Sequence, residues 1–304
     1  MKSTITILGC SGGIGADLRT TSLLLDDDIL IDAGTGVGDL SLNAMQNINT
    51  VFLTHSHLDH ICSIAFLLDA VGVDRKAPLQ VIGIEETITA LKTHIFNNVI
   101  WPDFTAIPNR SNPVLTFRTI HIGETIAIAR PNHAESSSSA DDGNTTRLIT
   151  ALPVQHSIPG NGYWIDSGEG ALVFSGDTGS APDFWQAVNH LNGNSGSEKD
   201  SKQRATNNKN NDENVDQNYL KHLIIEISFT NAEADLAKLS GHYHPAQLAA
   251  DLQLLQAPCS VWITHLKPGY GDAIMAELHQ DLKAINSKAK HSVQALKNAQ
   301  VLVF

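Results

Sequence analysis

Three histidines and an aspartate lie close together in the segment THSHLDH, residues 54–60. Imidazole nitrogens and carboxylate oxygens bind transition metals, and a metal site needs several such donors at one point. The spacing predicts that His55 and His57 face one metal ion while Asp59 and His60 face a second. A lone histidine is more often a polar loop residue or a hydrogen-bonded core residue, but this cluster favours a two-metal site.

Further donors stand at the ends of apolar runs that are typical of strands. His156 follows the run 148–155, His265 follows the run 260–264, and Asp177 comes shortly after another apolar run. Functional groups are often placed where a rigid scaffold ends, so these positions favour the same site. The predicted ligands are His55, His57 and His156 for one metal and Asp59, His60 and His265 for the other, with Asp177 bridging.

The apolar patterns around these donors predict the elements that position them. Residues 51–53 are typical of a buried strand, and residues 61–68 are typical of a buried helix. Strand patterns cluster in two runs flanked by helix patterns, which predicts the α/β (α+β) class, with two mixed β-sheets packed face to face and helices outside. The predicted strands are 1–8, 20–25, 29–32, 50–54, 79–82, 115–120, 124–130, 148–155, 163–166, 171–174, 222–227, 260–264 and 301–304. The predicted helices are 61–68, 85–96, 232–238, 245–256 and 272–285.

We expect one domain over residues 1–304, interrupted by a polar insertion. Residues 192–217 are rich in asparagine and lack apolar periodicity. Such a segment cannot bury enough apolar surface to order itself, so we predict that it is disordered. Residues 136–139 are four serines and are expected to form a surface loop.

Composition limits the possible partners. The 304 residues carry a formal net charge of -12, which argues against a protein that neutralises many nucleic-acid phosphates. Residues 1–8 lack the apolar core of a signal peptide, and no apolar run reaches the length of a membrane span. Cys10, Cys62 and Cys259 form no C-x-x-C pair, which is evidence against a disulfide framework or a thiolate metal site. We therefore expect a soluble cytoplasmic protein, with no nucleic-acid or membrane partner and with a homodimer as the default oligomer.

The donor pattern resembles a known superfamily. Residues 55–60, His156, Asp177 within 174–179, and His265 together resemble the metallo-β-lactamase superfamily, which implies an αββα sandwich. Within it, the segments 55–61, 91–104, 225–229, 239–242 and 263–268 resemble the class II 3′,5′-cyclic-nucleotide phosphodiesterases. The resemblance implies hydrolysis of a small cyclic nucleotide to a 5′-nucleotide by a metal-bridging hydroxide, with the choice between cAMP and cGMP left open.

The charges of a two-metal site and a phosphodiester indicate further roles. Two divalent metals about 3.5–4 Å apart can share a hydroxide and clamp a phosphodiester oxygen. Zinc fits this donor set best, while Mn²⁺ and Fe²⁺ remain open. Asp59 is expected to bind metal and orient the hydroxide. His242 is the expected proton donor to the leaving oxygen, with Glu226 orienting it, as in the related tRNA 3′-end endoribonucleases; a surface-loop role for His242 stays open.

Two more residues are expected to bind substrate. Lys267 can meet a phosphate oxygen as a point charge, and Trp101 can stack on a base. A solvated lysine and a core tryptophan are the alternatives.

Three hypotheses follow in order of preference. The first is a cyclic-nucleotide phosphodiesterase, and the second is a related hydrolase such as a tRNA 3′-processing endoribonuclease. The third is a non-catalytic binding module, which would be expected to have lost metal ligands, whereas all seven are present here.

Overall fold

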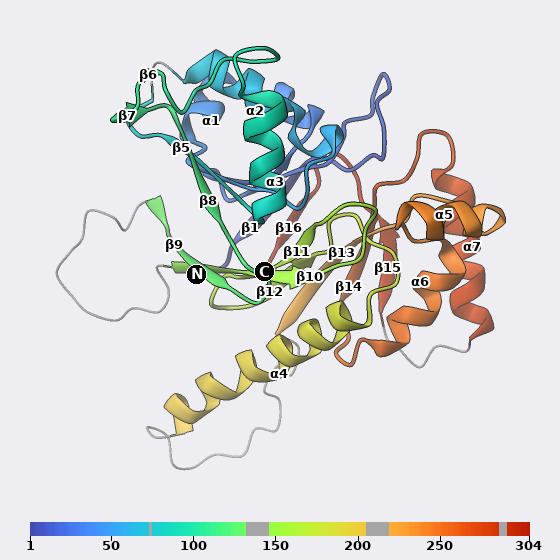
Figure 1. The fold of residues 1–304 in the computed structure, drawn as a ribbon. Coiled ribbons are helices and arrows are strands. Elements are labelled where there is room, and N and C mark those ends of the chain that lie inside the picture. Colours follow the sequence, from blue (N-terminus) through green and yellow to red (C-terminus); the bar gives the residue numbers. More distant parts are fainter. Residues whose placement is uncertain (73–74, 132–145, 205–218, 286–290) are drawn as a thin grey trace.

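The computed structural model describes residues 1–72, 75–131, 146–204, 219–285 and 291–304. Two seven-stranded sheets pack face to face, and helices cover both outer faces (Figure 1). The first sheet has the order β16-β1-β2-β3-β4-β5-β8 and the second has the order β15-β14-β13-β12-β11-β10-β9. This αββα arrangement confirms the predicted fold class.

Both sheets combine antiparallel and parallel strands. The strands of the first sheet are β1 (Thr4–Gly9), β2 (Ser22–Leu25), β3 (Ile29–Ala33), β4 (Thr50–Phe52), β5 (Leu79–Gly83), β8 (Leu115–Thr119) and β16 (Val301–Val303). The strands of the second sheet are β9 (Thr125–Ala129), β10 (Thr146–Pro153), β11 (Asn161–Asp166), β12 (Ala171–Phe174), β13 (Leu220–Glu226), β14 (Ser260–Thr264) and β15 (Ser292–Ala295). A separate two-stranded sheet pairs β6 (Pro108–Asn109) with β7 (Asn112–Pro113).

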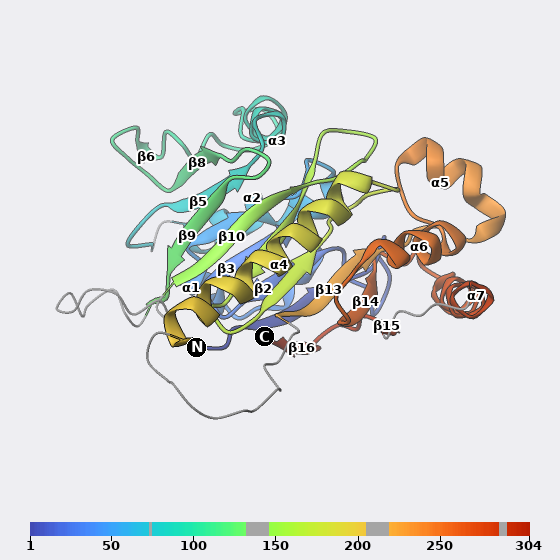
Figure 2. The same ribbon diagram turned by 90° about the horizontal axis from the view of Figure 1, so that it is seen from below.

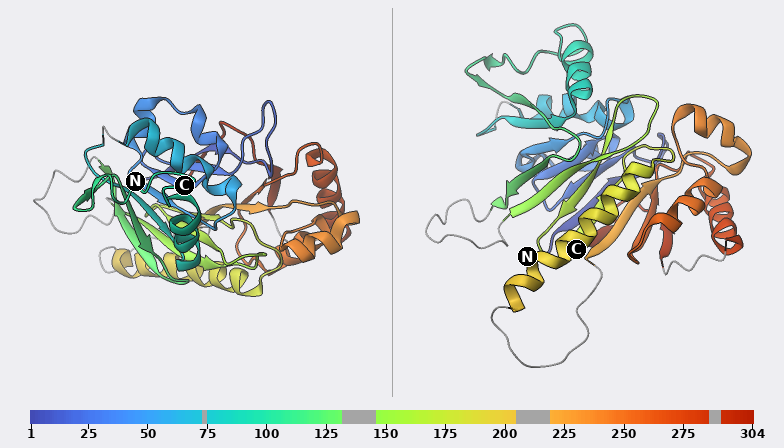
Figure 3. Two further views of the ribbon diagram at one scale, coloured as in Figure 1. Left: turned by 45° about the horizontal axis from the view of Figure 1, so that its top comes forward. Right: turned by 60° about the horizontal axis from the view of Figure 1, so that its bottom comes forward.

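The helices fall into two layers. The layer on the first sheet contains η1 (Thr35–Asp39), α1 (Leu42–Asn47), α2 (Leu58–Val71), α3 (Glu85–Ala90) and the π-helical turn η2 (Leu91–Ile95). The second layer contains α4 (Pro182–Arg204), η4 (Asn231–Glu233), α5 (Ala234–Ser240), α6 (Pro245–Asp251), η5 (Leu252–Leu254) and α7 (Gly271–Ala284). Figure 2 shows α4 crossing the second sheet, and Figure 3 shows the sheets between the two helical layers.

The apolar core has three parts, because the strands are buried on both faces. Successive residues of a strand point to opposite faces, so Phe52 packs between the sheets while Val51 packs under the helices of the first layer. In β12, Leu172 faces the inter-sheet core and Val173 faces the second helical layer. Burial on both faces explains why these strands read as continuous apolar runs in the sequence.

The parallel strands set the position of the polar loops. In the first sheet β3, β4, β5 and β8 run parallel, and in the second sheet β12, β13, β14 and β15 do so. Parallel strands bring their carboxyl ends to one edge of a sheet. The loops after β4, β12, β13 and β14 carry most of the predicted site residues.

The structure differs from the sequence-based expectation in the second half of the chain. Residues 192–204 of the expected disordered insertion continue helix α4 as far as Arg204. The start of α4 is anchored by buried Phe184, Trp185 and Val188, and a helix that has begun extends at little further cost. Residues 205–217 of that insertion and the predicted loop 136–139 lie outside the described residues. Strand β15 was not predicted, because its side chains alternate only between exposed and half-buried positions.

Within the described ranges, the helices are too short or too polar to cross a bilayer.

Candidate metal centre

The predicted histidine segment spans the loop after β4 and the first turn of α2. His57 is the N-cap residue of α2, and Asp59 falls in the first turn, where the helix dipole favours a negative charge. His55 and His60 are almost completely buried, whereas the side chain of Asp59 is 32% exposed. The loop thus presents two buried imidazoles and one accessible carboxylate.

Seven predicted ligands converge at this loop. One group holds the ligand atoms of His55, His57, His156 and Asp177 within 4.8 Å of one another. A second group holds those of Asp59, His60 and His265 within the same distance. Each donor that is added to the loop comes from the end of a strand, as the sequence predicts.

Asp177 lies between the two groups. Its Oδ2 is 3.8 Å from His55 Nε2 and 3.3 Å from His265 Nε2, while its Oδ1 is 3.4 Å from His60 Nε2. Asp177 is itself only 4% exposed. A carboxylate that faces ligands of both groups is suited to bridge two cations.

Most of the histidines are held from behind through Nδ1. His156 Nδ1 donates to Gly241 O at 2.9 Å, and His60 Nδ1 contacts Asp32 Oδ2 at 2.7 Å. The Thr54 hydroxyl donates to Asp32, so it accepts from His55 Nδ1 at 3.0 Å. These contacts turn Nε2 of each ring towards the donor cluster.

The donor set fits divalent metal ions. Nε2 of His55 and Nε2 of His60 are buried and have no hydrogen-bond partner. A buried polar atom without a partner costs about 1–3 kcal/mol, which a bound cation would remove. Imidazoles combined with carboxylates are typical ligands of transition metals, so these residues form a candidate divalent-metal site.

Burial and charge shift the pKa values in this cluster in opposite directions. Burial lowers the pKa of His55 well below its usual value, and burial also lowers the pKa of His156. Burial would raise the pKa of Asp177, but His265 and His60 hold it well below its usual value. Burial would lower the pKa of His60, but Asp177 and Asp32 raise it well above its usual value.

A third group lies beside the cluster. His242 Nδ1 is 2.7 Å from Glu226 Oε1, and Glu226 is completely buried. Burial would lower the pKa of His242, but the charge of Glu226 and its hydrogen bond raise it. His242 also shares a possible metal-ligand group with Asp177 and His265. The structure thus brings together the residues that were predicted to supply and orient a proton.

Sequence reasoning missed two residues behind the cluster. Asp32 accepts from the backbone N–H and the hydroxyl of Thr54 and contacts His60. Ser228 contacts Glu226, His242 and His265. Asp32 does follow an apolar run, as the other site residues do, but a single serine two residues after Glu226 gives no recognisable signal.

Lys267 and Trp101, the two residues that were expected to bind substrate, contact other parts of the fold. Lys267 Nζ donates to Gly12 O at 3.1 Å, and its charge lowers the pKa of His242 against the effect of Glu226. Trp101 packs edge to face on Phe66, with ring centroids 5.4 Å apart, and borders the core of the first helical layer. Lys267 therefore lies near the acid pair, while Trp101 belongs to the surface over α2.

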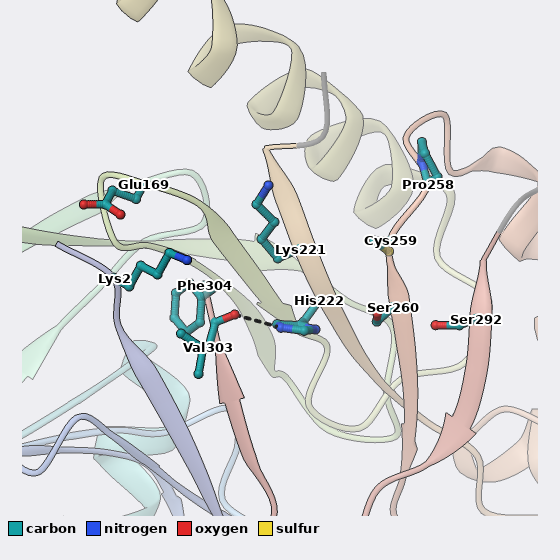
Figure 4. Close-up of a pocket in the computed structure, with 10 residues that line it drawn as sticks. All are labelled: Lys2, Glu169, Lys221, His222, Pro258, Cys259, Ser260, Ser292, Val303 and Phe304. Atoms are coloured by element: carbon teal, nitrogen blue, oxygen red, sulfur yellow. Dashed lines mark hydrogen bonds between the residues drawn. The ribbon is translucent and has the colours of Figure 1, made fainter. Parts of the chain in front are cut away.

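One pocket lies beside this site, and another lies at the opposite end of the second sheet. A cleft of about 650 Å³ is lined by His156 and by residues that include Ile84, Ile120 and Ile158. Another pocket, of about 450 Å³, lies where β13 and β14 begin, and its lining contains none of the predicted site residues (Figure 4). There His222 Nε2 donates to Val303 O at 3.1 Å (Figure 4). Only the first of these two pockets shares a residue with the metal cluster.

Comparison with known proteins shows which family the chain is similar to. The profile of the class-II cAMP phosphodiesterases matches residues 39–296. A probable 3′,5′-cyclic-nucleotide phosphodiesterase of Yersinia pestis is 29% identical over 252 residues, which cover 77% of this chain and 63% of that protein. The 3′,5′-cyclic-nucleotide phosphodiesterase of Aliivibrio fischeri is 27% identical over 295 residues, covering 83% and 75% of the two chains. A ribonuclease Z of Clostridium tetani is 37% identical, but over 87 residues that cover 26% of this chain and 28% of that protein.

Solved structures give the same fold. Unliganded yeast PDE1 superposes with a TM-score of 0.71 at 18% identity over 99% of both chains. The metallo-β-lactamase fold protein YhfI of Bacillus subtilis superposes with a TM-score of 0.66 at 17% identity, covering 100% of this chain and 99% of that one. The chain therefore has the metallo-β-lactamase fold, and it belongs to the class-II cAMP phosphodiesterase family.

Proposed function

We propose that this protein hydrolyses 3′,5′-cyclic nucleotides to 5′-nucleotides. One observation carries the proposal: seven donor side chains converge beside a paired histidine and glutamate. Such a site can hold the charge of a phosphodiester and also protonate the oxygen that leaves. Membership of the family supports cyclic nucleotides as the substrate class, with cAMP tested first and cGMP second.

The proposed cofactors are two divalent metal ions, with Zn²⁺ as the first choice and Mn²⁺ or Fe²⁺ as alternatives. His55, His57 and His156 would hold one ion, Asp59, His60 and His265 would hold the other, and Asp177 would contact both. Ions bound there supply an activated water and neutralise charge on the phosphate.

The remaining steps belong to the side chains of this chain. The partly exposed carboxylate of Asp59 both completes the second ligand group and orients the attacking water. His242 donates a proton to the 3′ oxygen as it leaves, since Glu226 fixes its Nδ1 and leaves Nε2 as the free end of the ring. Lys267 contacts a phosphate oxygen, and Trp101 stacks on the base. The cleft that shares His156 lies beside the ligand cluster.

The reaction is tested with purified, zinc-loaded protein and 3′,5′-cAMP or 3′,5′-cGMP, with the products identified by chromatography. We expect the 5′-nucleotide from the wild type and a loss of at least about a thousandfold in Asp59→Ala, because the variant lacks both a ligand and the group that orients water. A chelated sample should be equally inactive. Asp183→Ala, at an exposed position in α4, is the matched control and should keep full activity.

Two results would count against the proposal. If both cyclic nucleotides survive while a simple aryl phosphodiester is cut, the site is active but the substrate is another. If Asp59→Ala and the chelated sample retain the wild-type rate, the activity does not come from this cluster.

A second candidate function is tRNA 3′-end processing. It is favoured by local similarity to ribonuclease Z proteins, which covers 25–29% of this chain. The net charge of -12 argues against it, since RNA binding requires a basic surface. Cleavage of a precursor tRNA at a rate above that of cAMP hydrolysis would reverse the order of the two functions.

A further inference from the structure

We propose that the Ser228 hydroxyl is a positioning group that joins a metal ligand to the proton-donating pair. Ser228 lies just beyond β13, two residues after Glu226, and is 1% exposed. Through one oxygen it fixes His265 on one side and Glu226 with His242 on the other. The part that concerns His242 rests on the proposed function, whereas the part that concerns His265 rests only on metal binding.

The hydrogen bonds around Ser228 can be assigned by counting donors. Ser228 Oγ lies 3.1 Å from Glu226 Oε2, 2.8 Å from His265 Nδ1 and 3.1 Å from His242 Nδ1. A serine hydroxyl has one hydrogen to donate and two lone pairs that accept. The hydrogen goes to the carboxylate of Glu226, so His265 approaches Ser228 as a donor through its Nδ1–H.

This assignment determines what His265 presents to the cluster. With a proton on Nδ1, a neutral His265 can offer the Nε2 lone pair to a cation between Asp59 Oδ2 and Asp177 Oδ2, each 3.3 Å from Nε2. Without a cation, Nε2 can contact these oxygens only as a donor, as in its hydrogen bond to Asp59. A lone pair that faces two carboxylates is favourable when a cation lies between them. Ser228 thus holds His265 in the tautomer and the orientation of a metal ligand, which is how partners behind a metal-binding histidine act.

The same hydroxyl holds the other side of the network. Glu226 Oε2 accepts from Ser228, while its Oε1 accepts from His242 Nδ1 at 2.7 Å and from Thr178 N at 3.1 Å. Both oxygens of this buried carboxylate are therefore fixed. Without the hydroxyl, Oε2 is left in the interior without a donor, and the carboxylate can turn away from His242.

The backbone at this position does not depend on the hydroxyl. Ser228 N donates to Tyr243 O at 3.2 Å, and an alanine keeps that bond. Ser228→Ala therefore removes the three side-chain contacts and little else. Ser167→Ala is the matched control, because Ser167 is also buried and hydrogen-bonded, but in the β11–β12 turn at the opposite end of these strands from Asp177.

The first measurement is the apparent Zn²⁺ affinity of each purified variant, by competition with a chelator and without substrate. We expect about 10–100-fold weaker binding in Ser228→Ala, and a return to within about threefold of the wild type in Ser228→Thr, which keeps the hydroxyl. Ser228→Cys, which keeps the size but bonds weakly, should fall between serine and alanine. Ser167→Ala should bind zinc as the wild type does.

The second measurement is steady-state kinetics at saturating zinc. Ser228→Ala should lower kcat while KM changes little, because the His242–Glu226 pair acts on the leaving oxygen and not on binding. Wild-type zinc affinity in Ser228→Ala, or an equal loss in Ser167→Ala, would overturn the proposal. A wild-type protein that leaves cyclic nucleotides intact would contradict the proposed function. Because zinc binding is measured without a nucleotide, it would still test the role of Ser228 behind His265.

Discussion

His156 and His242 differ in the group that their Nδ1 atoms contact. His156 donates from Nδ1 to a neutral carbonyl, and burial lowers its pKa, so it favours the neutral form that a metal requires. His242 contacts the carboxylate of Glu226, and its pKa is raised above the usual value. The raised pKa favours the protonated form of His242, which suits a general acid.

This difference can be tested by changing the leaving group. In His242→Gln we expect kcat for cAMP to fall by about 10²–10⁴, because the 3′ oxygen then leaves without a proton. Bis(4-nitrophenyl) phosphate has a leaving group that needs no proton, so its hydrolysis should change far less. His279→Gln, on the exposed face of α7, is the control. Equal losses with both substrates would mean that His242 acts on metal binding or on folding instead.

The residues that could be predicted from the sequence share a visible pattern. His55, Asp177 and His265 each follow an apolar strand, and their side chains are typical metal ligands, so position and residue type indicate the same candidate site. Ser228 and Asp32 could not be assigned, because their roles depend on which imidazole lies within hydrogen-bond reach after folding. A hydroxyl or a carboxylate at a strand end has too many possible partners for the sequence to choose among them.

Helix α4 shows a similar limit for secondary structure. Its first turns bury Phe184, Trp185 and Val188 against the second sheet, whereas the sequence from residue 192 onwards is polar. The strands beside it were predictable, because burial on both faces makes them continuous apolar runs. The start of the helix was missed although Phe184, Trp185, Ala187, Val188 and Leu191 follow a helical period, because this pattern covers only about two turns before the polar segment begins.

The packing of α4 predicts where the stability of the second layer lies. Trp185 is 1% exposed, and Trp185→Ala should lower the free energy of unfolding by about 3–5 kcal/mol through lost burial and a cavity. Gln186→Ala, at the exposed neighbouring position, should change it by less than about 0.5 kcal/mol. Urea unfolding followed by fluorescence and circular dichroism measures both. A small effect of Trp185→Ala would mean that α4 contributes little to the fold.

A hydrogen bond joins the two sheets at the end of the strands away from the candidate metal centre. His222 on β13 donates from Nε2 to Val303 O on β16, which belongs to the other sheet. Its Nδ1 accepts from Trp262 Nε1 on the neighbouring β14 at 3.1 Å. A neutral ring with its proton on Nε2 can therefore make both hydrogen bonds. A second proton, on Nδ1, would break the bond from Trp262. Burial lowers the pKa of His222 below its usual value, although the bond to Val303 opposes this.

This arrangement predicts how stability depends on pH. Because the folded protein lowers the pKa of His222, the unfolded chain binds this proton more readily, and stability falls as the pH drops below about 6.5. His222→Gln has a neutral amide that can donate and accept, so its unfolding free energy should fall less between pH 7.5 and about pH 5.5, a range that spans the pKa of an unfolded histidine. The difference between the two proteins, measured by urea unfolding in excess chelator, isolates His222 because the other histidines titrate in both. If the unfolding free energies of the wild type and His222→Gln change in parallel over this range, the contact between the sheets does not depend on the neutral form of His222.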